Sequence, residues 1–136
     1  MTPEQAVDAI LDIFKAAWDT TGYPALYDDK SGEIPTSETP WARATIKHAT
    51  GAQSTLAGAS GTKRFTETGT LFVQVFTPVG DGSTACYKLA KVVRDAYRDA
   101  RDPELWFRNV FLEEIGINKA FRQINVQATF SYDEVR

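Results

Sequence analysis

The sequence predicts an α+β fold of two layers, in which two amphipathic helices pack on one face of a mostly antiparallel sheet of about four to six strands. Three observations support this prediction. Apolar residues recur at helical spacing in two segments, 3–19 and 84–101. Two other segments, 65–79 and 124–132, alternate between two faces as strands do. The 136 residues contain no repeat and have the size of one domain, so we expect 1–136 to form a single domain.

The first helix is expected over residues 3–19. Thr2 can cap its N-terminus, Pro3 suits the first helical position, and Gln5 stands where the partner in a capping box belongs. Apolar positions recur three and four residues apart, so the helix has one face that must pack on another layer. These positions are Ala6, Val7, Ile10, Leu11, Phe14, Ala17 and Trp18.

The region from 23 to 64 is less regular. Residues 23–27 and 41–48 suggest two strands, and the segment between them suggests a polar turn followed by an extended, proline-containing stretch. In 49–64, twelve of sixteen residues are Gly, Ala, Ser or Thr. Because so few large apolar side chains cannot offset the entropy cost of ordering, we expect a loop that is mobile in the free chain and orders against a partner.

The segment 65–79 gives the clearest strand. Large apolar residues occupy both of its faces, which places it at the centre of the sheet. Glycines and a proline follow as an exit turn, and Ser83 or Thr84 can cap the second helix, expected over 84–101. Cys86 falls on the apolar stripe of that helix, where it is expected to act as a small hydrophobe.

A terminal hairpin is expected after the second helix. Residues 105–114 predict one strand, 115–119 a turn, and the segment around 124–132 a last strand with one buried face. Asp133, Glu134 and Arg136 are expected to form a solvated tail.

Composition excludes several classes of protein. The net charge of -3 and the pI near 5.1 argue against a basic surface that binds nucleic acid. The single cysteine excludes an internal disulfide and a zinc site built from several thiolates. No apolar run exceeds three residues, so the sequence predicts no membrane span.

The chain offers little for catalysis. His48 is its only histidine, and we expect it at the end of a strand, half-exposed. Glu113 and Glu114 are neighbours on a strand and therefore point to opposite faces. The glycine turn before the second helix lacks the lysine and the spacing of a nucleotide-binding loop. We therefore predict no catalytic residue, no cofactor and no metal site.

Large aromatic residues remain to be placed. If the helices cover one face of the sheet, Phe72, Phe76, Trp106 and Trp41 need partners elsewhere. Either these rings pack under loops, or several lie on the uncovered face and make it an association surface. The residue pattern leaves both alternatives open.

The segment from Phe65 to Gly82, FTETGTLFVQVFTPVGDG, resembles the central signature of the tail terminator, or tail completion, proteins of long-tailed phages and prophages. The helix around Leu89-Ala90, the stretch WFRN at 106–109 and the ending FSYDE at 130–134 are also similar to that family. The resemblance covers nearly the whole chain, and its motifs are structural rather than catalytic.

The resemblance implies a structural protein that forms a ring, a hexamer in most members. Such a ring caps the tail tube at its final length and provides the surface to which the head attaches. The implied partners are further copies of this chain, the tail tube protein and the head–tail connector protein, with no membrane. The protein would lie in the virion tail after assembly in the cytoplasm of the bacterial host. DNA would be only passing cargo, since six copies would carry about -18 and would repel it.

We expect the oligomer or tube interface to include seven residues: Trp41, Arg43, Lys63, Arg64, Phe72, Gln74 and Phe76. Two alternatives remain at this stage. One is a head–tail connector or neck protein of the same virion, and the other is an enzyme that binds a small molecule between the sheet and the helices.

Overall fold

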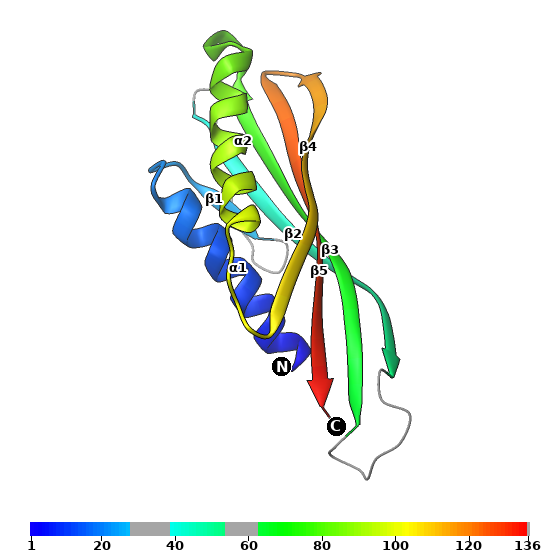
Figure 1. Cartoon of the computed structure of the whole chain (residues 1–136). Helices are drawn as coiled ribbons and strands as arrows, with labels where there is room; N and C mark the ends of the chain where they lie inside the picture. The colour runs from blue at the N-terminus through cyan, green and yellow to red at the C-terminus, as the bar shows by residue number, and fades with distance from the viewer. Residues whose placement is uncertain (28–38, 54–62, 136) are drawn as a thin grey trace.

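A computed structural model describes residues 1–27, 39–53 and 63–135 (Figure 1). Within these residues, two α-helices and five strands follow one another in the order α, three β, α, two β, with a short 3-10 turn at Val79–Asp81 before the second helix. Their bounds are α1 Pro3–Asp19, β1 Ala25–Tyr27, β2 Trp41–Gln53, β3 Arg64–Pro78, α2 Ser83–Arg98, β4 Leu105–Asn118 and β5 Phe121–Val135.

The five strands form one sheet in the order β1-β2-β3-β5-β4. Short β1 pairs with β2 in parallel, and all the other neighbours are antiparallel. Both helices lie on the same face of this sheet (Figure 1). The predicted two-layer α+β fold is therefore confirmed, and β3 is central as expected.

The core lies between the helices and the covered face of the sheet. Its buried side chains come at helical spacing from α1 and α2 and at alternate positions from the strands, as binary patterning requires. Cys86 is among them, which agrees with its predicted role as a small hydrophobe. The Tyr97 hydroxyl donates a hydrogen bond of 2.8 Å to the Ile10 carbonyl and so joins the two helices inside the core.

The start of α1 is built as predicted. The Gln5 backbone N–H donates to the Thr2 hydroxyl at 3.3 Å, and the Thr2 backbone N–H donates to the Gln5 side chain at 2.9 Å. The start of α2 differs from the prediction, because neither Ser83 nor Thr84 caps it. Gly82 occupies the cap position with a φ of 82°, a conformation that favours glycine, and the helix then runs from Ser83 to Arg98 rather than to 101.

The loop predicted over 49–64 is shorter than expected. Residues 49–53 continue β2 and Arg64 begins β3, and the backbone of 50–53 pairs with 65–68. Ladder hydrogen bonds satisfy the backbone here, so the small side chains do not prevent strand formation. The predicted mobility of 54–62, like the turn and extended stretch predicted over 28–38, lies outside the described residues.

The terminal hairpin is longer than predicted. Strand β4 continues to Asn118 and the turn contracts to Lys119–Ala120, because bulges after Arg108 and after Glu114 absorb residues that broke the simple alternation. The predicted solvated tail is also wrong for Asp133 and Glu134, which belong to β5. The Asp133 carboxylate accepts a hydrogen bond of 2.8 Å from the Thr66 hydroxyl across the β3–β5 pair.

Gly69 lies at the centre of the sheet, where neighbouring atoms leave no room for a side chain. A Cβ at this position would overlap the Lys47 backbone oxygen and the Phe130 ring. We expect Gly69→Ala to lower the free energy of unfolding by about 1–3 kcal/mol, as overpacking does. The matched control is Gly80→Ala, because a Cβ there meets nothing within 4 Å. Urea unfolding of both variants would check this, and equal stabilities would contradict it.

Candidate functional site

The sheet has a second face that the described helices do not cover, and we call it the open face. On β3 the residues Leu71, Val73 and Val75 are buried under the helices, whereas the alternate residues Phe72, Gln74 and Phe76 are only partly buried on the open face. The aromatic residues singled out from the sequence therefore include two that point away from the helices.

Cross-strand register arranges the open face in rows. One row joins Thr45, Phe72, Gln127 and Phe111, and the next joins Arg43, Gln74, Asn125 and Glu113. A third row joins Lys47, Thr70, Thr129 and Arg108. Half of these twelve side chains carry a hydroxyl or an amide, four are charged and two are aromatic.

Polar side chains on this face hold one another in place. The Arg43 guanidinium donates to the Gln74 side-chain oxygen at 2.7 Å, and the Gln127 amide donates to the Glu113 carboxylate. The Gln123 amide donates to the Asn125 side chain at 2.8 Å. These bonds fix side chains that would otherwise move freely, which lowers the entropy cost when a partner binds.

An aromatic cluster closes one end of the open face. The Trp41 and Phe76 rings stack with centroids 4.1 Å apart, and Phe121 meets both edge-on at about 6 Å. Trp41 is 4% exposed, and its indole N–H finds no acceptor among the described residues. The cluster is therefore a rigid apolar end of the face that carries an unused donor.

Exposed apolar side chains also follow β4, the edge strand. Trp106 is 49% exposed and Phe111 is 44% exposed, and both lie on the open face. Ile117 is also exposed but pairs with Arg122 on the helix side. The two bulges in β4 make its edge irregular, which disfavours simple strand addition and leaves the side chains as the surface that a partner can contact.

Five of the seven residues predicted for an interface lie close together: Trp41, Arg43, Phe72, Gln74 and Phe76 occupy neighbouring positions of β2 and β3 on the open face. The structure does not bring Lys63 and Arg64 to them. Arg64 is ten residues from Gln74 along β3, a distance of about 33 Å for an extended strand. The interface role of all seven stays a prediction.

Phe111 and Phe121 are not among the interface residues expected from the sequence, for two reasons. A strict alternation from Trp106 would turn Phe111 toward the helices, and only the bulge at Asn109 and Val110 returns it to the open face. Phe121 begins β5, three residues before the predicted alternation, and extending that alternation backward would have found it.

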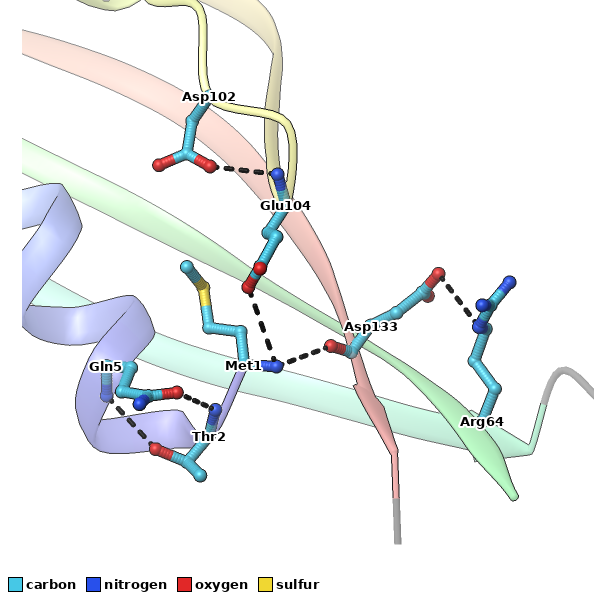
Figure 2. A network of polar contacts seen from close by, with 7 residues as sticks. All are labelled: Met1, Thr2, Gln5, Arg64, Asp102, Glu104 and Asp133. Carbon is cyan, nitrogen blue, oxygen red and sulfur yellow. Dashed lines mark hydrogen bonds and ion pairs between the residues drawn. The ribbon is translucent and has the colours of Figure 1, made fainter. Parts of the chain in front are cut away.

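A polar network at the other end of the sheet ties the start of α1 to β5 and to the loop before β4 (Figure 2). The Met1 amino group donates to the Asp133 carbonyl at 3.2 Å and lies 3.8 Å from the Glu104 carboxylate. Arg64 pairs with the Asp133 carboxylate at 3.7 Å, and the Glu104 backbone N–H donates to Asp102. These charges are paired locally, so the network holds elements together. Arg64 and Asp133 follow the open-face alternation and line a hollow with Trp106, so the network borders the end of the open face that is remote from the aromatic cluster.

His48 does not lie in an enclosed cleft. It belongs to β2 just before a bulge and is exposed, with its Nε2 2.7 Å from the Tyr132 hydroxyl. With Pro3, Glu4, Val7 and Asp8 it lines an open hollow of about 420 Å³. Its ring meets Phe130 and Tyr132 edge-on at 5.4 and 5.7 Å, which is the packing of a structural histidine.

Cys86 and the neighbouring carboxylates Glu113 and Glu114 are the other candidate reactive groups in the described ranges. Burial raises the pKa of the Cys86 thiol, which disfavours the thiolate. Glu113 and Glu114 pair with Asn125 and Ile124 and so point to opposite faces, as predicted. Within residues 1–27, 39–53 and 63–135, no group of three His, Cys, Asp or Glu residues could hold a metal ion. Neither described helix is long and apolar enough to cross a membrane.

Tyr132 gives the fold a predictable response to alkaline pH. Burial raises the pKa of its hydroxyl to about 12, and burial also raises the pKa of Tyr97. The ordinary pKa of a tyrosine hydroxyl is about 10, so as the pH rises Tyr132 ionises in the unfolded chain before it ionises in the folded one. The free energy of unfolding should therefore be unaffected below pH 10 and should fall as the pH rises from 10 to 12. Urea unfolding at pH 8 and pH 11 would measure this loss.

The Tyr132→Phe variant is the control for this effect. It loses the contact with His48 and should be less stable at pH 8 by about 0.5–1.5 kcal/mol. Its further loss between pH 8 and pH 11 should be smaller than that of the unaltered chain. Equal further losses would show that Tyr132 is not responsible.

Comparison with known proteins gives one family match. A family model described as "Phage tail terminator protein" matches residues 5–113. No curated protein sequence matches the chain. One solved structure aligns over 90% of this chain and 94% of its own, with 18% sequence identity and a TM-score of 0.58. At that identity the likeness shows a shared fold alone.

Proposed function

The chain belongs to the phage tail terminator family, and we propose that it forms a ring that caps the tail tube and provides the surface to which the head attaches. Membership in the family makes it a structural protein of the virion tail. The ring, its hexameric state and its partners are the finer part of the proposal. Those partners are other copies of this chain, the tail tube protein and the head–tail connector protein.

One observation carries this proposal beyond the family match. The open face bears large partly exposed rings, Phe72, Trp106 and Phe111, held on a rigid sheet among hydrogen-bonded amides. Aromatic rings and arginine are enriched in protein interfaces. Two of the charged residues on this face, Arg43 and Glu113, already hydrogen-bond to amide side chains, which keeps these groups paired when a partner excludes water. We propose that the open face contacts the end of the tail tube.

Capping then needs no chemical reaction. A ring that matches the tube on one side stops its growth if the other side offers no site for a further tube subunit. That other side carries the two helices, whose exposed positions are mostly charged or polar, whereas the open face is the pleated surface of the sheet (Figure 1). The difference between the two sides makes assembly directional.

The test is removal of the chain from a phage or prophage that carries it. We expect tails of uncontrolled length without heads, and normal infectious particles when the unaltered chain is supplied again. Normal tails and normal titre without the chain would overturn the proposal. Tails of normal length that only fail to join heads would favour a neck protein instead.

A further inference from the structure

The two helices carry opposite charges that do not neutralise each other. Helix α1 has four carboxylates and one lysine, a net charge of -3, whereas α2 has four basic residues and one aspartate, a net charge of +3. The described residues contain no ion pair between the two helices: Lys15 pairs with Asp19 on α1, and Arg94 pairs with Asp95 on α2. Most of this charge is therefore directed to solvent.

The acidic residues lie on the side of α1 nearest to β1 and β2. Asp8 and Asp12 line a hollow with Tyr27 of β1, and Glu4 and Asp8 line the hollow that contains His48 of β2. All three carboxylates are exposed and recur four residues apart. We call Glu4, Asp8 and Asp12 the acidic flank.

The basic residues lie on the opposite side of the molecule, where α2 borders β4. The Arg98 guanidinium donates to the Val110 carbonyl of β4 at 2.8 Å, and Tyr87 lines a hollow with Glu114 and Gly116 of β4. Since Tyr87, Lys91, Arg94 and Arg98 recur at spacings of three and four, Lys91 and Arg94 lie on that same side. We call Lys91, Arg94 and Arg98 the basic flank.

From this arrangement we infer that a second copy of the chain is the partner of each flank, with the basic flank of one copy docked on the acidic flank of the next. The inference rests on the proposed ring. The two flanks stand at opposite edges of the sheet, as a head-to-tail contact that closes into a ring requires. Apolar side chains accompany both charged sets, with Leu11 and Tyr27 at one edge and Tyr87 and Ile117 at the other.

This placement also leaves the open face free. The flanks belong to the helix layer, whereas Phe72 and Phe111 lie on the open face, so we expect the contact to leave both rings free. Opposite charges favour the docking of a basic flank on an acidic flank. Contacts between two acidic flanks or between two basic flanks are disfavoured, because like charges repel.

Two charge-reversed variants test the contact. The first is Asp8→Lys with Asp12→Lys, and the second is Lys91→Glu with Arg94→Glu. Each variant then has flanks of one sign and should associate at least about tenfold more weakly than the unaltered chain. An equimolar mixture of the two should assemble again, because every contact in an alternating ring pairs opposite signs. Sedimentation velocity at low salt measures all three samples.

Controls with the same changes in net charge lie away from the flanks. Asp81→Lys with Glu113→Lys matches the first variant, and Lys47→Glu with Lys119→Glu matches the second; all four positions are exposed and lie outside both helices. Circular dichroism would establish that each variant folds. Both control pairs should associate as the unaltered chain does, and association should weaken as salt screens the flanks.

The outcomes separate this inference from the proposed function. If the unaltered chain assembles and the flank variants assemble equally well, the flank contact is wrong and the ring stands. If the mixture of variants fails to assemble while each variant is folded, the contact is also wrong. If the unaltered chain stays monomeric even at millimolar concentration, both the contact and a ring formed by this chain alone are overturned.

Discussion

Replacing Trp18 with alanine should lower the free energy of unfolding by about 3–5 kcal/mol. The indole is 1% exposed, stacks with Phe14 at 6.1 Å, and donates a hydrogen bond of 3.0 Å to the Pro24 carbonyl. The variant therefore loses packing and one of the two hydrogen bonds that the Pro24 carbonyl accepts; the other, from the Ala42 backbone N–H at 3.3 Å, remains. Domains of this kind are stable by about 5–15 kcal/mol, so a large part of the total would be lost.

Trp106→Ala is the matched control for this prediction. It removes the same ring from a position that is 49% exposed, and should change stability by less than about 1 kcal/mol. Urea unfolding followed by far-ultraviolet circular dichroism avoids reliance on tryptophan fluorescence. Losses of equal size in the two variants would contradict the assignment of Trp18 to the core.

The second large effect concerns assembly rather than folding. Replacing both Phe72 and Phe111 with serine should leave the fold intact and weaken attachment to the tail tube by about a hundredfold or more, since each buried ring contributes about 1.5–3 kcal/mol. The two rings flank Gln127 in one cross-strand row of the open face. The measurement is binding of the purified chain to isolated tail tubes, together with the titre of infectious particles.

A matched control removes exposed apolar groups outside the open face. Tyr23→Ser with Val79→Ser replaces side chains that are 40% and 37% exposed, close to the 44% of Phe111, one after α1 and one in the turn before α2. This pair should bind tubes and support infection normally. If it is as defective as the open-face pair, general loss of apolar surface explains the defect and the open face has no special role.

The layers of the fold were predictable because they rest on periodicity. The capping box at Thr2 and the recurrence of Ile10, Phe14 and Trp18 specify α1 without any long-range information. The alternation in β3 likewise predicted both its central place and the direction of Phe72 relative to Val73. These features depend on neighbouring residues along the chain, so the sequence alone predicts them.

The errors arose where long-range pairing overrides local composition. The backbone of residues 49–53 is ordered by its ladder to β3, although the side chains are small. The bulge at Asn109 and Val110 depends on how β4 meets β5, so no count along the chain could place Phe111. The distance between Arg64 and the aromatic residues likewise depends on the length of β3, which its pairing with β2 and β5 sets.

The most direct test of a ring that ends the tail is imaging of purified tails by cryo-electron microscopy. The account predicts a closed ring of this chain at one end of the tube, with the sheet face that carries Phe72 and Phe111 against the last tube subunits. Tails whose terminal density contains no copy of the chain, or copies distributed along the tube, would contradict it.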